Sequence, residues 1–258
     1  MSQYFATVIW SIILSTAYFL VAHGSRDPRP QLALEQIAEQ LRLRLSTVHF
    51  TLIGTGVLEC APLSLTQQLQ QFADLIRPQG MTRIKILPLF LLPGVHVKED
   101  IPVEVAMAQQ ILGSEMTLEV LPYMGSQVDK IATVLADQMK LFTVETWIVM
   151  AHGSSRQGGN QPIKFLADKL AIIPAYWSVS PNLSEQIQAL IQQGYSKIGV
   201  LPYFLFTGGI TDAIAQSIQN LSQQFIDTEL YLAKPLDQTT ALIDLAQVLL
   251  FNEMEGKE

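Results

Sequence analysis

The chain has 258 residues, of which 49% are hydrophobic and 15% charged, with a net charge of −7 and a pI near 5.1. This length allows one large or two small domains with ample core, and the composition argues against disorder. The acidic balance argues against a general nucleic-acid binder, which needs a basic face. Cys60 is the only cysteine, which excludes an intrachain disulfide framework and fits a reducing compartment. We expect this thiol to be small, buried and unreactive.

The N-terminal run from Phe5 to Ala22 carries no charge, so a membrane span or a signal peptide has to be considered. No Lys or Arg precedes Arg26, so the run lacks the positively charged residues that normally precede a signal peptide or flank a membrane span. The end of the run, Tyr18–Ala22, also matches a later segment, Trp147–Ala151, that looks like a buried strand. We therefore interpret residues 1–15 as an apolar extension outside the fold, with a membrane-tethered form as the alternative.

Strand and helix patterns alternate along the rest of the chain. In the first half, strands are predicted at Tyr18–Ala22, Val48–Ile53, Arg83–Leu89 and Thr117–Leu121, and helices at Gln31–Leu45, Leu65–Ile76, Pro102–Leu112 and Gln127–Leu141. In the second half, strands are predicted at Trp147–Ala151, Ala175–Val179, Lys197–Tyr203 and Leu230–Ala233, and helices at Gln161–Ile172, Ser184–Gln193, Asp212–Phe225 and Gln238–Phe251. Ser64 and Ser126 are expected to cap the helices that follow them.

This alternation predicts parallel sheets joined by right-handed crossovers and covered on both faces. The fold class is α/β, with two similar, open, flavodoxin-like sheet domains that face a central cleft. We expect an N-terminal domain over residues 16–143 and a C-terminal domain over residues 144–258, with the boundary near Phe142–Glu145.

The two halves share motifs but differ in reactive side chains. Ala-His-Gly-Ser occurs at His23 and again at His152. In the first half Glu59 follows the second strand and His96 follows the third, so three side chains meet at the carboxyl edge of one sheet, where ligands bind. Alone, each is more often a structural histidine or a solvated loop glutamate. The repeat places Ser178 opposite Glu59 and Ile210 opposite His96, which favours a chemical role in the first half.

These segments resemble the class II tetrapyrrole chelatases, in the sirohydrochlorin ferrochelatase and cobaltochelatase branch and its long, internally duplicated form. The resemblance rests on His23-Gly-Ser-Arg26, on Val57-Leu-Glu59-Cys-Ala-Pro62, and on Pro88-Leu-Phe-Leu-Leu-Pro-Gly94-Val-His96-Val-Lys-Glu-Asp100-Ile-Pro102. It covers roughly residues 17 to 250. It implies that His23 and His96 handle the metal and that Glu59 assists. In the second half only His152 matches, so a second working site there is not expected.

The residue chemistry agrees with this resemblance. Neutral imidazole suits Fe²⁺, Co²⁺ and Ni²⁺, and two His with one Glu leave coordination positions open. We expect no permanently bound cofactor: the metal is a substrate, with Fe²⁺ favoured, Co²⁺ as the alternative and Ni²⁺ as a third choice. His or Glu can also accept a pyrrole proton.

The carboxylates of a sirohydrochlorin need cations, and Arg26, Arg29 and Lys98 flank the two histidines. His152 is a further candidate for substrate binding. The alternative for the three cations is ordinary surface charge. Glu99 and Asp100 are expected to cap the helix that begins at Pro102 rather than to bind metal.

Other functions fit less well. The sequence has no Gly-x-Ser-x-Gly motif, which argues against a serine hydrolase. It has neither Gly-x-Gly-x-x-Gly nor a Walker loop, which argues against a nucleotide-dependent enzyme. A non-catalytic carrier of tetrapyrrole or metal would share every ligand and is the remaining alternative. We expect a cytoplasmic monomer that binds sirohydrochlorin and a metal ion, with no nucleic-acid partner and no membrane association. The remaining histidine, His49, is expected to serve structure.

Overall fold

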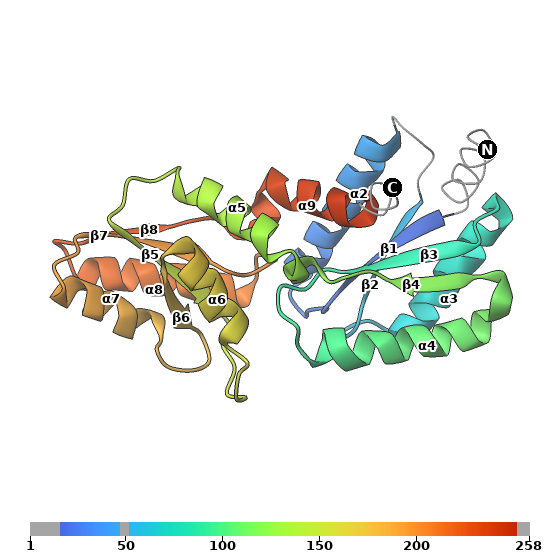
Figure 1. Cartoon of the computed structure of the whole chain (residues 1–258), viewed down its shortest axis with the longest axis horizontal. Coiled ribbons are helices and arrows are strands. Elements are labelled where there is room, and N and C mark those ends of the chain that lie inside the picture. Colours follow the sequence, from blue (N-terminus) through green and yellow to red (C-terminus); the bar gives the residue numbers. More distant parts are fainter. Residues whose placement is uncertain (1–15, 47–51, 252–258) are drawn as a thin grey trace. The chain divides into compact units, whose positions relative to one another are not determined.

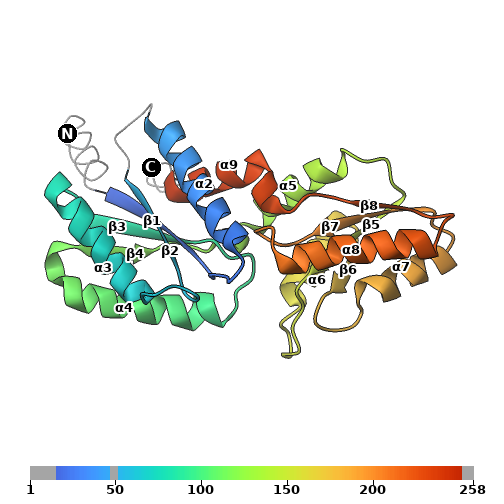
Figure 2. The same ribbon diagram turned by 180° about the vertical axis from the view of Figure 1, so that it is seen from behind.

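The structure, a computed structural model, describes residues 16–46 and 52–251. These residues form two four-stranded parallel sheets flanked by helices, with strand orders β2-β1-β3-β4 and β6-β5-β7-β8 (Figures 1 and 2). The α/β class and the internal duplication expected from the sequence are confirmed. In each sheet the first strand in sequence lies between the second and the third, which makes the order flavodoxin-like.

The first half contains β1 Thr16–Ala22, α2 Pro28–Ser46, β2 Ile53–Val57, α3 Leu65–Ile76, β3 Arg83–Pro88, α4 Ile101–Leu112, β4 Thr117–Val120 and α5 Val128–Met139. The second half contains β5 Thr146–Ala151, α6 Gln161–Leu170, β6 Ile173–Tyr176, α7 Leu183–Gln192, β7 Lys197–Pro202, α8 Gly209–Gln224, β8 Glu229–Leu232 and α9 Thr240–Phe251.

Most elements lie within a few residues of their predicted bounds, but three details differ. Strand β2 begins at Ile53, where the predicted strand ended; His49 and residues 1–15 lie outside the described residues. Helix α4 is preceded by a short π-helix, His96–Asp100, so the helical segment starts six residues before Pro102. Ser64 caps α3 through a capping box, whereas Ser126 does not cap α5: its hydroxyl is buried without a partner among the described residues.

Each sheet packs one face on a separate apolar core. In the first, Phe19, Val21, Ile84 and Ile86 of the sheet pack with buried residues of α3 and α4. In the second, Ile148, Met150, Ile198 and Val200 pack with α7 and α8. Strands buried on both faces read as the continuous apolar runs seen in the sequence, because helices cover both sides of a parallel sheet.

Two helices belong to one half by sequence and to the other by contact. The contacts divide the chain into unit 1, which contains the residues up to Ser126 and from Ile243 onward, and unit 2, which spans Gln127–Leu242. Helix α5 is therefore part of unit 2, where Asp129 pairs with Lys169 of α6 at 2.7 Å. Most of α9 is part of unit 1, where its Asp244 pairs with Arg44 of α2.

None of the helices that the structure describes is both long and apolar enough to cross a bilayer. The last residues of the charge-free N-terminal run, from Thr16 to Ala22, form the fully buried strand β1.

Candidate metal centre

The candidate site is built by three loops at the carboxyl edge of the unit 1 sheet. His23 follows β1, and Glu59 follows β2, the strand paired with β1 in the register Ala22↔Val57. The Glu59 N–H donates to the His23 carbonyl at 2.9 Å, which fixes the two loops side by side. Gly24 has φ +96°, and a Cβ there would lie 1.9 Å from the Glu59 carbonyl oxygen. Only glycine allows this approach.

The structure brings His23, Glu59 and His96 together. One ligand atom from each lies within 4.8 Å of the other two. The imidazole rings of His23 and His96 meet edge to face, with centroids 4.5 Å apart and an interplanar angle of 89°. His23 and Glu59 are exposed and His96 is partly buried, so a bulky ligand can reach the set from solvent.

Hydrogen bonds select which nitrogen each histidine offers. His23 Nδ1 lies 3.0 Å from the Gly24 carbonyl oxygen, which only accepts, so Nδ1 carries the proton. His96 Nδ1 lies 2.6 Å from Asp100 Oδ2 and is oriented in the same way by a carboxylate. Both histidines therefore present Nε2 to the site. A carboxylate behind a ligating histidine is the usual outer partner of a metal centre, because it fixes the ring and raises its basicity.

Asp100 corrects an expectation. It occupies the residue before α4 but makes no side-chain capping hydrogen bond, and its backbone is helical. The π-helix explains this: the Ile101 N–H already bonds the His96 carbonyl, so the helix continues back through Asp100 and needs no cap there. The Asp100 carboxylate is therefore available to His96.

The second half repeats the strand and loop arrangement and keeps one histidine, His152, but has no counterpart of Glu59 or His96. The His152 ring makes the same contact to the Gly153 carbonyl, at 3.0 Å, and the Ser178 N–H donates to the His152 carbonyl at 2.8 Å. Ser178 therefore stands where Glu59 stands in unit 1, as the sequence repeat indicated. Ile210, opposite His96, packs on the apolar core of unit 2.

The cations near the site differ in their surroundings. Arg29 is paired with Asp27 through its Nε and Nη2 atoms, and Asp27 also accepts the Arg29 backbone N–H at the start of α2. Hydrogen bonds from the Arg29 side chain lower the pKa of Asp27 to about 2. Arg26 and Lys98 are exposed. Within residues 16–46 and 52–251 neither of these two side chains has a hydrogen-bond or ion-pair partner.

Cys60 also corrects an expectation, because its thiol is exposed rather than buried. It directly follows Glu59 and has φ +59°, a left-handed backbone that is uncommon outside glycine and asparagine.

The fold and the site together define a duplicated α/β protein in which one half carries a cluster of two histidines and a glutamate that could hold a metal ion. A family model named CbiX matches residues 17–140 and again residues 146–251. The chain belongs to the CbiX family.

Relatives and solved structures agree with this assignment. The sirohydrochlorin ferrochelatase of Priestia megaterium is 29% identical over 231 residues, which cover 81% of this chain and 82% of the relative. The sirohydrochlorin cobaltochelatase of the same organism is 23% identical over 231 residues, which cover 83% and 72%. The structure of SirB from Bacillus subtilis with Fe³⁺ has a TM-score of 0.75 and 20% identity, over 92% of this chain and 94% of that one. At that identity it shows the shared fold.

Proposed function

We propose that this protein is a sirohydrochlorin chelatase, which inserts a divalent metal into the tetrapyrrole. Its similarity to a sirohydrochlorin ferrochelatase over 81% of the chain supports the substrate. The observation that carries the chemistry is the meeting of two imidazoles and one carboxylate, with ligand atoms within 4.8 Å of one another. Fe²⁺ is the favoured metal and Co²⁺ the alternative. A ferrochelatase is 29% identical to this chain and a cobaltochelatase is 23% identical, so the similarity supports both metals and ranks Fe²⁺ first.

The reaction exchanges one metal ion for two protons. The two Nε2 atoms and the Glu59 carboxylate hold M²⁺ at the sheet edge, and the metal passes from them to the four ring nitrogens. The two pyrrole N–H groups each release one proton, so M²⁺ and the free tetrapyrrole give the metal complex and two H⁺. After the metal has left, the freed Nε2 of His23 or His96, or the Glu59 carboxylate, accepts a pyrrole proton.

The site is suited to releasing its metal. His23 and Glu59 are exposed, so the tetrapyrrole can approach an ion that these two side chains and His96 hold. Three protein ligands leave a coordination position open, which a ring nitrogen can enter before the protein ligands are released. A fully closed four-ligand site would instead retain the metal.

The residues around the centre have supporting roles in this proposal. Arg26 and Lys98 pair with carboxylates of the tetrapyrrole. Arg29 serves the same purpose only after exchanging Asp27 for the substrate, so we rank it below Arg26. A role for His152 in substrate binding, a monomeric state and a cytoplasmic location stay predictions.

Anaerobic absorption spectroscopy of sirohydrochlorin with Fe²⁺ or Co²⁺ tests this function. Catalytic amounts of protein should accelerate metal insertion, and H23A and H96A should each lower kcat/KM by about 100-fold or more, as expected for loss of a ligand or proton acceptor. The matched comparison is H152A, which removes the equivalent ring from the second half and should keep kcat near the wild-type value, while the predicted role of His152 in substrate binding would appear as a higher KM.

Two results would contradict the proposal. Tight tetrapyrrole binding without acceleration over the uncatalysed rate would make the protein a carrier. Loss of activity in H152A alone, with H23A and H96A active, would move the centre to the second half.

A further inference from the structure

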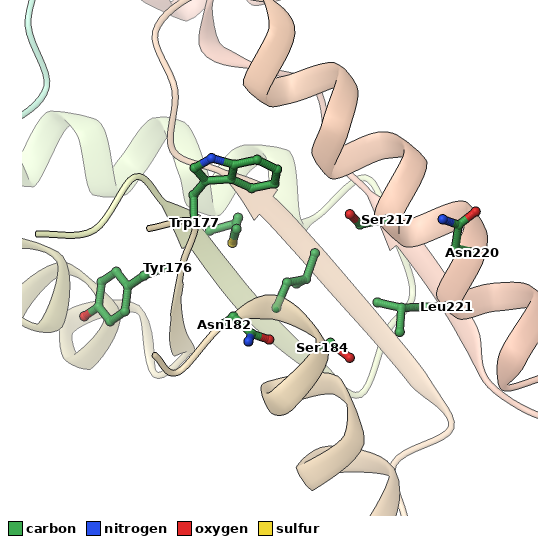
Figure 3. A pocket seen from close by; sticks show the side chains of 9 residues that line it. Tyr176, Trp177, Asn182, Ser184, Ser217, Asn220 and Leu221 are labelled. Carbon is green, nitrogen blue, oxygen red and sulfur yellow. The ribbon is translucent and has the colours of Figure 1, made fainter. Parts of the chain in front are cut away.

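Unit 2 contains a cavity of about 320 Å³ between α7, α8 and the carboxyl ends of β5 and β6. Its polar lining comes from Asn182 and Ser184 at the start of α7 and from Ser217 and Asn220 on α8 (Figure 3). Met150, Leu183, Leu221 and Trp177 form its apolar part, while the Tyr176 ring points away from it (Figure 3). All residues that line this cavity belong to unit 2, whereas the candidate metal centre is built from residues of unit 1.

The same place in unit 1 is filled by a carboxylate. Glu104 of α4 reaches the start of α3, where its Oε2 accepts the Thr66 backbone N–H at 2.8 Å and the Thr66 hydroxyl at 2.7 Å. Thr66 is buried at this contact. A carboxylate at this position satisfies a free N–H of the first helical turn and interacts favourably with the helix dipole.

Matching the helices of the two halves shows what replaces this contact. Ser64 and Asn182 are the N-caps of α3 and α7 and form the same capping box, which makes Ser184 the counterpart of Thr66. Ser64 is five residues after Glu59, whereas Asn182 is four residues after Ser178, so this loop is one residue shorter in the second half.

The buried faces of α4 and α8 set the remaining register. Ile101, Val105 and Ala108 of α4 correspond to Ile214, Ile218 and Leu221 of α8, all of them buried. In this register, Ser217 is the counterpart of Glu104. The cavity therefore occupies the space that a glutamate side chain fills in unit 1.

We propose that this cavity binds the carboxylate of a small organic acid, in the place that the Glu104 carboxylate takes in unit 1. In the part of the chain that the structure describes, the Ser184 N–H has no acceptor. The Ser184 hydroxyl accepts only a 3.2 Å contact from Gln188, so its proton is available to a ligand. The Asn220 amide oxygen is used by Gln216, which leaves the Asn220 NH₂ group as a further donor.

The rest of the lining selects an acid with a compact apolar body. Met150 and Leu221 contribute buried apolar surface, and Trp177, which is 41% exposed, contributes an aromatic ring. The lining residues include no Lys, Arg or His, so the carboxylate is held by hydrogen bonds and the helix N-terminus rather than by an ion pair. A monocarboxylate with a single ring or a short branched chain matches this set, and a polyanion does not.

Titration of the full-length, ¹⁵N-labelled protein with benzoate tests the proposal, with benzamide as a neutral probe of the same shape. Benzoate should shift the Ser184 amide and the Trp177 indole N–H resonances saturably. Benzamide should bind about tenfold more weakly or not at all, because a charged acceptor forms the stronger hydrogen bonds.

Two variants localise the effect. S217E restores the unit 1 arrangement, so its own carboxylate should shift the Ser184 amide in the free protein, raise Tm and abolish benzoate binding. S184A removes only the hydroxyl and should weaken benzoate binding several-fold with little change in Tm. If S217E does not fold, the benzoate affinity of S184A still tests whether Ser184 binds the carboxylate.

The proposal is overturned if benzoate leaves the Ser184 amide unmoved, if benzamide binds as well as benzoate, or if S217E folds and still binds benzoate like the wild type. None of these readouts depends on metal insertion, so the result stands apart from the chelatase proposal.

Discussion

The contact between His96 and Asp100 decides how the metal centre presents its second imidazole. The two residues are four apart on a helical segment, a spacing that places side chains on one face, and the His96 Nδ1 to Asp100 Oδ2 distance is 2.6 Å. The sequence already contained this spacing. Acidic residues favour helix N-termini, so Asp100 just before Ile-Pro predicts a helix cap, and the π-helix that extends the segment backwards has no sequence signature of its own.

We predict that D100A lowers the affinity for Co²⁺ by about 10- to 100-fold, the usual effect of losing the outer partner of a metal-ligating histidine. Co²⁺ titration followed by absorption spectroscopy measures it, and ¹⁵N shifts of the His96 ring should show a change in the Nδ1–H population that a purely structural defect would not cause.

E99A is the matched control, since Glu99 is the exposed neighbour of Asp100 and should leave Co²⁺ affinity unchanged. Equal affinities in D100A and wild type would show that His96 is held without its carboxylate.

At the residue scale, the three metal-centre side chains could be chosen from sequence because two independent patterns pointed to them. They follow consecutive strands of a parallel sheet, and two of them are missing from the repeat. The partners of the surrounding charges could not be chosen in this way. The Arg29–Asp27 pair and the exposure of Cys60 depend on local backbone turns, which residue types alone do not determine.

Helices and strands followed from hydrophobic periodicity, and the error in β2 has a clear cause. Gly54 and Gly56 look like turn residues but are inside the strand. A Cβ at Gly54 would lie 2.7 Å from the Phe19 ring, and one at Gly56 would lie 2.6 Å from it. The glycines leave room for the Phe19 ring, which lies against β2, a tertiary contact that a strand pattern does not reveal.

The start of β7 depends on one exposed carboxylate. Glu145, just before β5, accepts the backbone N–H groups of Ser196 at 2.7 Å and Lys197 at 2.9 Å. These hydrogen bonds lower the pKa of Glu145 below its usual 4.5. A carboxyl group whose pKa falls on folding stabilises the native state above its unfolded pKa, and this contribution disappears as the pH falls through its folded pKa.

We therefore predict that E145Q has a lower Tm than wild type at pH 7, and that the difference shrinks as the pH falls below about 4.5. Thermal unfolding between pH 3 and pH 7 measures it. E115Q makes the same change at an exposed site and should follow the wild type throughout. A Tm difference for E145Q that stays constant with pH would show that the ionised carboxylate is not what holds β7.

At the scale of the whole molecule, sequence reasoning recovered two repeats but not the exchange of helices between them. Helix α5 is amphipathic and helix α9 is apolar over most of its surface, and such patterns state that side chains are buried without stating which unit buries them. Contacts assign α5 to unit 2 and most of α9 to unit 1. The expected domain boundary between residues 143 and 144 concerns where the two sequence repeats meet, and it stays a prediction.

The exchange predicts that damage to the last helix is felt in unit 1. Ala246 of α9 is fully buried, so A246D places a carboxylate in an apolar environment. We expect faster hydrogen exchange in α2 and around β1, and little change in α7 of unit 2.

Hydrogen exchange with mass spectrometry resolves these segments. The control, A215D, makes the same change at an exposed position of α8 and should leave both units protected. Increased exchange confined to α7 and α8 in A246D would contradict the assignment of α9 to unit 1.

Because unit 1 includes residues from both ends of the chain, it is assembled out of order during synthesis. His23, Glu59 and His96 leave the ribosome first, yet their sheet lacks α9 until the segment that forms unit 2 has been made. At about 5–20 residues per second, this delay is roughly 6–23 s. The nascent protein thus completes unit 2 before unit 1, and a chain that ends before Ile243 lacks the helix whose Asp244 pairs with Arg44 of α2.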